Sequence, residues 1–582
     1  MLKARTGTGY SSHFEGITGI ITCYAMPFMP KITIDNEVYD VPPGKTIIQV
    51  ADEVGVQIAR YCYHPDIGIE GSCRMCLVEV EKAPKLMPSC ATPVADGMIV
   101  RTTTPRVQQA VRYAMEFLLL HHPIDCPVCD QSGECWLQDY YMERAGHTSR
   151  YPGTDKTRRT KAETLGPLVK LDRERCILCT RCVRFTRNVT KTGEIGVFNR
   201  GHSSEIAVHG GKSFDNPYSG NVVDICPVGA LTSSDFRFKS RVWFLKGASS
   251  VCAGCSTGCN LRIDHTARAT GGGISGYSAT DGKIYRTVGR RNVDVNKSWL
   301  CDEGRLSFHT LERWDRLGEA RAGAIDSADL AGILAAAHTR FEGIRRESGD
   351  AAVAGLASAV NTNEALFLMK QYFRGNVDFR LGREVETYQV RQDDLLRRVD
   401  KHPNTQGAID LGLAGGLDGL RGLIERAKAK QIRAMWISFH PQLVGDDPAE
   451  AISGLEELIA NLDFSVVSTT HTFPWAFGAT IVLPMAAWSE ETGTYTNYEG
   501  RVQLTNRAVE PPGDALPLHR LLRELLALGG TAAGIRPEEI FEWLAQEIPA
   551  YAGLDYDTIG VLGAPRRAPE SAPSNMPEEV TR

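Results

Sequence analysis

The placement of the cysteines constrains this chain more than any other feature of its sequence. Fifteen of its 16 cysteines lie between Cys62 and Cys301, and none lies in the last 281 residues. Most of them form tight groups in which two residues separate neighbouring cysteines. A disulfide scaffold is short, secreted and dense in cysteine throughout, which this chain is not. The pattern therefore predicts metal ligation in a reducing compartment.

Length and charge exclude several classes of protein. A chain of 582 residues is too long for a single core, so we expect roughly three to five domains. The net charge of −5, from 65 basic and 70 acidic residues, gives no electrostatic reason to expect a nucleic acid partner. No apolar run approaches the length of a membrane span, so membrane association is expected only through partner proteins.

The first 28 residues match neither a folded domain nor a good secretory signal. Polar residues follow the basic start, where a signal peptide would place its apolar core. We expect residues 1–28 to be a disordered or non-native leader, and we assign no role to Cys23 within it.

Apolar periodicity predicts a multidomain protein with α/β and α+β parts. The first folded segment has the order of a β-grasp domain: two hairpin strands, a helix, a cysteine-bearing loop and a strand, at 31–34, 37–41, 46–59 and 77–80. A further helix is expected to begin at Thr104-Pro105 and to end before Pro123. Residues 171–235 show little regular pattern.

After Arg305 the composition changes to helices rich in Ala, Leu and Arg that alternate with strand-like runs. This alternation predicts an α/β domain with a largely parallel sheet. The expected strands are 351–360, 434–439, 464–468 and 480–484, and the expected helices are 449–460 and 518–528. Residues 561–582, rich in Pro, Ser and Glu, are expected to be a disordered tail.

The first candidate ligand set is Cys62, Cys73, Cys76 and Cys90. A [2Fe–2S] cluster needs four thiolates, and a long loop with a central C-x-x-C and an outlying cysteine on each side supplies them. Gly71 and Ser72 allow the backbone to approach and to donate to the sulfurs. Zinc is the alternative, but zinc prefers two C-x-x-C pairs and this set has one.

The second set is His122, Cys126, Cys129 and Cys135. Three cysteines need a fourth partner to hold a [4Fe–4S] cluster, and His122 ends the preceding helix close to them. A neutral imidazole in place of a thiolate makes a cluster less anionic and should raise its potential. His121 is the competing ligand.

The third set is Cys176, Cys179, Cys182 and Cys226, with proline after the last cysteine. Three closely spaced ligands and a distant Cys-Pro are typical of a [4Fe–4S] cluster. Four arginines near this set can offset the negative charge of a cluster: Arg173, Arg175, Arg181 and Arg184. Alternatively, they form a solvated face.

The fourth set is Cys252, Cys255, Cys259 and Cys301. It also fits [4Fe–4S], although C-x-x-C pairs serve zinc as well.

In combination, four motifs within residues 31–235 resemble one family. They are G-S-C-R-M-C-L-V-E-V, H-H-P-I-D-C-P-V-C-D-Q-S-G-E-C, R-C-I-L-C-T-R-C-V-R-F and D-I-C-P-V-G-A-L. The chain is similar to the cluster-bearing G-type subunit of bacterial NADH–quinone oxidoreductase, the 75 kDa subunit in mitochondria. The resemblance implies one [2Fe–2S] and two [4Fe–4S] clusters in the main electron path. The fourth set matches an extra cluster that some bacterial members carry off that path.

The resemblance and the motifs together predict five folded domains between the leader and the tail. These are a [2Fe–2S] ferredoxin-like domain (29–103), a His/Cys3 [4Fe–4S] domain (104–150), a ferredoxin-like [4Fe–4S] domain (151–240), a fourth-cluster [4Fe–4S] domain (241–305) and a molybdopterin-oxidoreductase-like α/β domain (306–560).

That last domain departs from working molybdenum enzymes. Residues 357–364 and 491–503 resemble the framework of the molybdopterin-dependent oxidoreductases. Formate dehydrogenases of that group take a Cys or selenocysteine ligand after the cluster, and no Cys follows Cys301 here. Glu303 stands where they usually place Lys, and the chain ends about 80 residues after Arg501. We expect no molybdopterin, although a serine or aspartate ligand to molybdenum is not excluded.

The resemblance implies an electron relay from a flavin and NADH-binding subunit to quinone-side iron–sulfur subunits. The complex would lie at the cytoplasmic face of the bacterial inner membrane, held to the membrane arm by its partners. No NADH or quinone site and no catalytic residue are expected on this chain. Its one G-x-G-x-x-G match, at 271–276, lies inside the fourth cysteine group and opens no helix.

Three other functions are weaker alternatives. The main one is the catalytic large subunit of an NAD-linked molybdenum or tungsten formate dehydrogenase, which shares the same front end. The others are the diaphorase small subunit of an NAD-linked hydrogenase and a zinc-binding scaffold.

Overall fold

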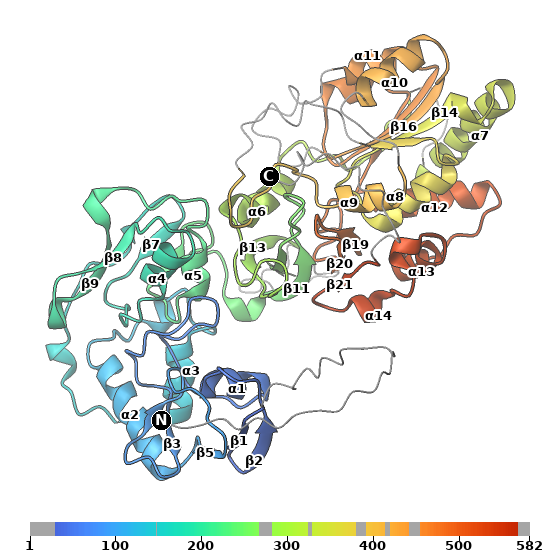
Figure 1. Ribbon diagram of the computed structural model, residues 1–582. Coiled ribbons are helices and arrows are strands. Elements are labelled where there is room, and N and C mark those ends of the chain that lie inside the picture. The colour runs from blue at the N-terminus through green and yellow to red at the C-terminus, as the bar shows by residue number, and fades with distance from the viewer. Residues whose placement is uncertain are drawn as a thin grey trace, which may run out of the picture. The chain divides into compact units, whose positions relative to one another are not determined.

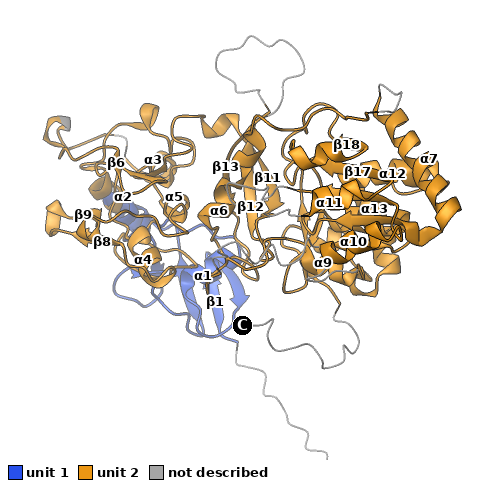
Figure 2. Cartoon of the chain, turned by 90° about the horizontal axis from the view of Figure 1, so that it is seen from above, with its two compact units in different colours: residues 1–60, 74–113 blue, residues 61–73, 114–582 orange. Residues whose placement is uncertain are grey.

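The computed structural model describes residues 29–146, 148–266, 282–323, 329–379, 392–413, 419–440 and 454–567 (Figure 1). The chain divides into two compact units (Figure 2): unit 1 is Met1–Arg60 with Arg74–Tyr113, and unit 2 is Tyr61–Cys73 with Ala114–Arg582. The leader with Cys23, the G-x-G-x-x-G match at 271–276 and the chain after residue 567 lie outside the described residues.

Unit 1 is built on a five-stranded sheet in the order β2-β1-β5-β3-β4. Its strands are β1 (Lys31–Ile34), β2 (Glu37–Asp40), β3 (Leu77–Val80), β4 (Met87–Pro88) and β5 (Met98–Arg101). Asp35 and Asn36 join β1 to β2 with φ of +46° and +80°, the left-handed backbone of a two-residue hairpin turn. β5 pairs in parallel with β1, which gives the mixed sheet of the expected β-grasp order.

Helix α1 (Ile47–Glu53) is shorter than the predicted 46–59. It begins where Thr46 and Gln49 form a capping box. It ends early because Gly55, with φ of +78°, takes the left-handed conformation that commonly terminates a helix. Helix α2 (Pro105–Leu119) begins at the predicted proline.

Residues 163–233 carry more regular structure than their sequence indicated. A small sheet, β10-β7-β6, and a hairpin, β8-β9, accompany helices α4 and α5. Their bounds are β6 (Glu163–Thr164), β7 (Val169–Leu171), α4 (Arg181–Asn188), β8 (Ile195–Phe198), β9 (Glu205–Val208), α5 (Asn221–Ile225) and β10 (Leu231–Ser233). The sequence of residues 171–235 shows little regular pattern because elements this short do not show a period.

An antiparallel sheet, β11-β12-β13, carries the fourth cysteine set. Its strands are β11 (Lys246–Val251), β12 (Asn260–His265) and β13 (Ile284–Gly289). The turn from β11 to β12 holds Cys252, Cys255 and Cys259, and helix α6 (Asp302–Leu306) begins directly after Cys301.

The remaining chain contains the predicted parallel sheet, in the order β15-β14-β16-β17-β18. The strands are β14 (Val353–Ala357), β15 (Val377–Phe379), β16 (Ala434–Phe439), β17 (Phe464–Thr469) and β18 (Ile481–Pro484). Along β16, Ala434 and Trp436 belong to one apolar cluster, whereas Met435 and Ile437 belong to another. The sheet is therefore buried on both faces, as parallel sheets are.

Different helices cover the two faces of this sheet (Figure 1). One cluster includes residues of α7 (Leu330–Ser348), α8 (Asn363–Tyr372), α12 (Leu518–Leu528) and α13 (Pro537–Glu547). The other includes residues of α10 (Gly419–Lys428) and α11 (Leu455–Ala460). Helix α12 has its predicted bounds, whereas residues 449–453 of the predicted helix 449–460 lie outside the described residues.

The last sheet contradicts part of the prediction that residues 561–582 are disordered. It has the order β19-β20-β21, with β19 (Gly493–Thr496), β20 (Arg501–Thr505) and β21 (Ala564–Pro565). The expectation of disorder from residue 561 was wrong for 564–565, where the backbone pairs with β20. Composition does not reveal this contact, because proline is tolerated in an edge strand.

Candidate iron–sulfur sites

The four cysteines of the third set line one cavity of about 360 Å³. Within their loop, Leu178 and Thr180 have φ of +53° and +58°, a backbone conformation that non-glycine residues adopt only when their surroundings impose it. The Leu178 N–H donates to Cys176 Sγ at 3.4 Å. Most of the other lining side chains are apolar. Four sulfurs in one enclosure suit a group that takes four thiolate ligands.

Burial and mutual repulsion raise the pKa values of the thiols of this set. Burial, together with the negative charge of Cys179, raises the pKa of Cys176 and of Cys226 to about 12. Burial also holds the pKa of Cys182 well above its ordinary value. Thiolates packed this closely need a compensating positive charge, which a metal centre supplies when it deprotonates its ligands. The donor set and the enclosure therefore fit a [4Fe–4S] cluster.

Three of the four arginines near the third set are buried. Arg175, Arg181 and Arg184 are 4%, 2% and 2% exposed, so the alternative of a solvated face is wrong for them. Arg173 lies further out and forms ion pairs with Glu163 and Glu205. Buried guanidinium groups beside thiolates place positive charge where an anionic cluster needs it.

The second set is tied to the third through Arg175 and Gly229. Arg175 Nη2 donates to Asp125 Oδ2 at 2.9 Å, and these two residues directly precede the first cysteines of their sets. Cys129 Sγ lies so close to Gly229 that a Cβ there would clash with it. Sequence reasoning missed both contacts. The available signals were the arginine and aspartate preceding the cysteines and the glycine shortly after Cys226.

The structure distinguishes His122 from His121. His122 Nδ1 is buried and has no hydrogen-bond partner among the described residues. His121 is exposed, and its Nδ1 accepts a hydrogen bond from the Thr157 N–H at 3.2 Å. Burial, followed by the charge of Lys156, lowers the pKa of His122 to about 4, so its imidazole is neutral at neutral pH. A neutral imidazole with a buried, unengaged nitrogen fits a ligand.

Lys156 holds the start of the His122 loop. Its Nζ donates to the carbonyls of Leu119, Leu120 and His122 at 2.8, 3.1 and 2.7 Å. These carbonyls lie at and just after the end of α2, where a helix leaves its acceptors unpaired and its dipole favours a cation. Cys129 and Cys135 are buried in the loop beyond, whereas Cys126 is exposed.

The fourth set brings together four buried thiols. Cys252, Cys255, Cys259 and Cys301 are at most 8% exposed. Gly304 lies against two of them, since a Cβ there would be 2.9 Å from Cys252 Sγ and 3.4 Å from Cys301 Sγ. The Gly304 N–H donates to Cys301 Sγ at 3.3 Å. Burial raises the pKa of Cys301 to about 12, and Cys255 adds to the effect, so this set fits a cluster as the third does.

The cysteines of the first set are divided between the two units. Cys62 and Cys73 belong to unit 2, where a hydrogen bond from Cys73 lowers the pKa of Cys62 to about 4 against the effect of burial. Cys76 and Cys90 are buried in unit 1. Residues 61–73 belong to unit 2 and bind within it, for example where Asp66 Oδ2 accepts a hydrogen bond from Ser298 Oγ at 2.6 Å.

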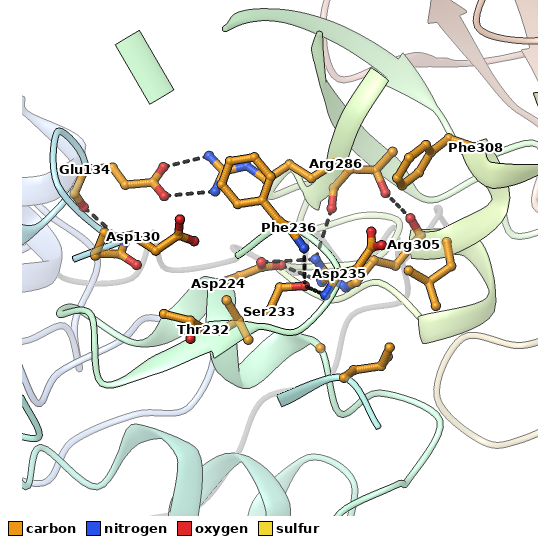
Figure 3. A pocket seen from close by; sticks show the side chains of 16 residues that line it. Asp130, Glu134, Asp224, Thr232, Ser233, Asp235, Phe236, Arg286, Arg305 and Phe308 are labelled. Carbon is orange, nitrogen blue, oxygen red and sulfur yellow. Dashed lines mark hydrogen bonds and ion pairs between the residues drawn. The ribbon is translucent and has the colours of Figure 1, made fainter. Parts of the chain in front are cut away.

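Ion pairs join the ligand segments around a second cavity of about 580 Å³ (Figure 3). Arg286 of β13 binds both oxygens of Glu134, the residue before Cys135, at 2.9 and 2.8 Å. Arg305 of α6 pairs with Asp224, two residues before Cys226. These partly buried pairs attract more strongly than exposed ones and hold the second, third and fourth sets together.

No helix within the described part of the chain is long and apolar enough to span a membrane. No three His, Cys, Asp or Glu side chains among the described residues are arranged to hold a single metal ion.

Protein-family models match four parts of the chain. A 2Fe-2S iron-sulfur cluster binding domain matches residues 29–105, and the NADH-ubiquinone oxidoreductase-G iron-sulfur binding region matches 112–150. The ferredoxin-like domain of NADH-quinone oxidoreductase subunit 3 matches 166–232. A molybdopterin oxidoreductase model matches 401–528.

Whole-chain relatives decide the family. The G-type subunit of NADH-quinone oxidoreductase from Rickettsia bellii is 31% identical, and the match covers 90% of each chain. The 78 kDa subunit of NADH-ubiquinone oxidoreductase from Neurospora crassa is 30% identical, over 85% of this chain and 80% of that protein. The chain belongs to the family of G-type subunits of NADH-quinone oxidoreductase. The resemblance drawn from the four motifs is therefore confirmed, and so is the multidomain fold class.

In this member of the family, polar side chains at the ends of the parallel strands bind one another. Ser438 Oγ donates to Asn361 Oδ1 at 2.9 Å, and Asn361 Nδ2 lies 3.0 Å from His440 Nε2. His471 Nε2 lies 2.8 Å from the Thr310 carbonyl. Ligands of open α/β sheets bind at this end of the strands, so these polar groups are already engaged where a cofactor would need them.

Proposed function

We propose that this chain is the iron–sulfur electron-transfer subunit of an NADH-quinone oxidoreductase and relays electrons from a flavin subunit towards quinone. The third set carries the proposal, because its C-x2-C-x2-C and distant Cys-Pro place four thiols around one cavity. Relatives that match over nine tenths of their length bear that enzyme's name. We place no NADH or quinone site on this chain.

The proposed ligands form four sets. A [2Fe–2S] cluster is assigned to Cys62, Cys73, Cys76 and Cys90. [4Fe–4S] clusters are assigned to three sets: His122 with Cys126, Cys129 and Cys135; Cys176, Cys179, Cys182 and Cys226; and Cys252, Cys255, Cys259 and Cys301. When bound, such clusters accept and release single electrons. No molybdopterin is assigned, because Asn361, Ser438 and His440 at the ends of the parallel strands are engaged with one another.

The chain itself positions the sets and controls their surroundings. Mostly apolar side chains line the third set, and the four thiols of the fourth set are buried away from water. Arg175, Arg181 and Arg184 supply positive charge beside anionic ligands. Neutral His122 gives the second set one negative charge fewer than four thiolates would, which raises its potential relative to an all-cysteine site.

The partner that we propose for the second set is a quinone-side iron–sulfur subunit of the peripheral arm. Cys126 is exposed, and so is Val128 two residues later. Trp243, which contacts the neighbouring loop at Gly133, is 57% exposed. Exposed apolar side chains beside a redox ligand suit a protein partner. The flavin subunit would bind elsewhere, and the complex would lie at the cytoplasmic face of the bacterial inner membrane.

Metal analysis tests this proposal. Full loading predicts about 14 irons per chain, with matching acid-labile sulfide, after anaerobic purification. Finding that ratio without molybdenum or tungsten supports the relay. Stoichiometric molybdenum or tungsten would favour the formate dehydrogenase alternative, and stoichiometric zinc would favour a scaffold.

The fourth set needs a separate test, because we place it off the main path. In Cys255→Ala the iron content should fall to about 10 per chain while NADH–quinone activity of the assembled complex is kept. A large loss of activity at normal assembly would place this set on the path instead.

A further inference from the structure

Arg181 contacts the residue next to a proposed ligand in three different sets. Its Nη1 donates to the Ile225 carbonyl at 3.0 Å, and Ile225 precedes Cys226. Its Nη2 donates to the Tyr63 carbonyl at 2.6 Å, and Tyr63 follows Cys62. Its guanidinium carbon lies 4.5 Å from the centre of the Trp136 ring, and Trp136 follows Cys135. Arg181 itself precedes Cys182.

Arg181 differs from Arg175 and Arg184 in its charge partner, because each of those two arginines lies beside a carboxylate. Arg175 pairs with Asp125 at 2.9 Å, and Arg184 lies 3.5 Å from Glu70. In the described part of the chain no carboxylate pairs with Arg181, and its Nε has no hydrogen-bond partner. A guanidinium stays protonated in proteins, and a buried unpaired charge is costly. Anionic groups close by would offset that cost.

The surrounding sulfurs are those groups. Cys179 lies two residues before Arg181 and Cys182 directly after it, and the carbonyls that Arg181 binds belong to the neighbours of Cys226 and Cys62. A cation favours the more negative of two redox states, which is the reduced one, and so raises a reduction potential.

We propose that Arg181 is a positioning residue whose charge raises the reduction potential of the cluster at the third set, and to a smaller extent of those at the first and second sets. This inference rests on the proposed function, since it requires clusters at those sets. The third set responds most because Arg181 lies within its own ligand sequence.

The test is a redox titration of the purified complex, followed by EPR of each cluster, with iron counted per chain. Arg181→Met keeps the apolar stem but removes the charge. We expect about a tenfold fall in the ratio of reduced to oxidised third-set cluster at a fixed potential. For a one-electron couple, that fall is a shift of about 59 mV to more negative potential. The fourth set is the internal reference and should not shift.

Two further variants separate charge from packing. Arg181→Lys retains the charge and should stay within about twofold of the wild-type ratio. Arg187→Met removes the same charge from the exposed side of the same helix, where solvent screens it, and should cause no shift. Arg181→Gln, which keeps an amide donor, replaces Arg181→Met if that variant binds less iron.

Each result bears on the proposal. Unchanged potentials in the neutral variants would overturn it, as would an equal shift in Arg181→Lys. Loss of the third-set cluster in both neutral variants but not in Arg181→Lys would support the role of the charge. Its loss in all three would assign Arg181 to packing alone. Failure of the proposed function is distinguishable, because the wild type would then either lack iron or hold stoichiometric molybdenum or tungsten.

Discussion

The cysteine-bearing part of unit 2 and the α/β region after residue 305, called the tail from here on, bury different kinds of side chain. In the tail, apolar clusters cover both faces of a parallel sheet, with Trp436 and Leu522 at 0% exposure. Between residues 114 and 305, arginines and thiols occupy the interior, and Arg181 is 2% exposed. Burying charge is costly unless it is compensated. We infer that the tail completes its core with its own side chains, whereas the cysteine-bearing part completes its core with bound metal.

The sharpest test of that contrast removes one thiol from the third set. Cys179→Ala should lower the iron content to about 10 per chain and reduce NADH–quinone activity to background, because the cavity loses a ligand. Iron analysis, EPR and activity of the purified complex measure this. Cys23→Ala, at a cysteine without an assigned role, is the control. Intact activity in Cys179→Ala would contradict the inference that the cysteine-bearing part depends on bound metal.

A glycine in each region gives a matched pair. Gly229→Ala should cost the second-set cluster, about four irons per chain, because its Cβ would displace Cys129 Sγ. Gly422→Ala, on helix α10 with open space around it, should instead stabilise the fold by about 0.5–1 kcal/mol. Iron content and thermal unfolding compare the two. Retention of all irons in Gly229→Ala would contradict the packing described here.

A cavity in the tail should weaken the fold without touching the metal sites. Leu522→Ala, fully buried on α12, should lower the free energy of unfolding by about 2–5 kcal/mol. Iron content and EPR signals should stay unchanged. Leu528→Ala, on the same helix but 49% exposed, should stay within about 0.5 kcal/mol of wild type. Loss of iron in Leu522→Ala would show that the two regions are not independent.

The smallest expected effect concerns pH. Burial raises the pKa of Glu364 to about 7 from an ordinary 4.5. Between pH 4.5 and pH 7, Glu364 is therefore protonated in the folded protein but ionised in the unfolded chain. The protonated carboxyl stabilises the fold fully at low pH, and this stabilisation is lost as the pH rises from 4.5 to 7. Glu364→Gln should flatten the dependence of Tm on pH, whereas exposed Glu524→Gln on α12 should not. A wild-type Tm that rises between pH 4.5 and pH 7 would contradict the raised pKa of Glu364.

The sequence predicted the bounds of helices and strands most accurately where a single pattern marks the element. The bounds of β16 and α12 were predicted correctly because a buried run and an apolar period mark them. Helix α1 was placed correctly but ended early at Gly55. Helix α4 was missed because it buries Arg181 and Arg184, so its buried face does not look apolar. The edge strand β21 was missed because only backbone pairing defines it.

By itself, the sequence determined the candidate ligand types and their spacing, because the geometry of a cluster restricts which cysteines a single loop can offer. The family followed from the same motifs. Tertiary structure alone decided that His122 has the buried free nitrogen, that Gly229 makes room for Cys129, and that Arg181 lies beside three sets. These features depend on contacts between residues up to 118 positions apart, and local spacing carries no record of such contacts.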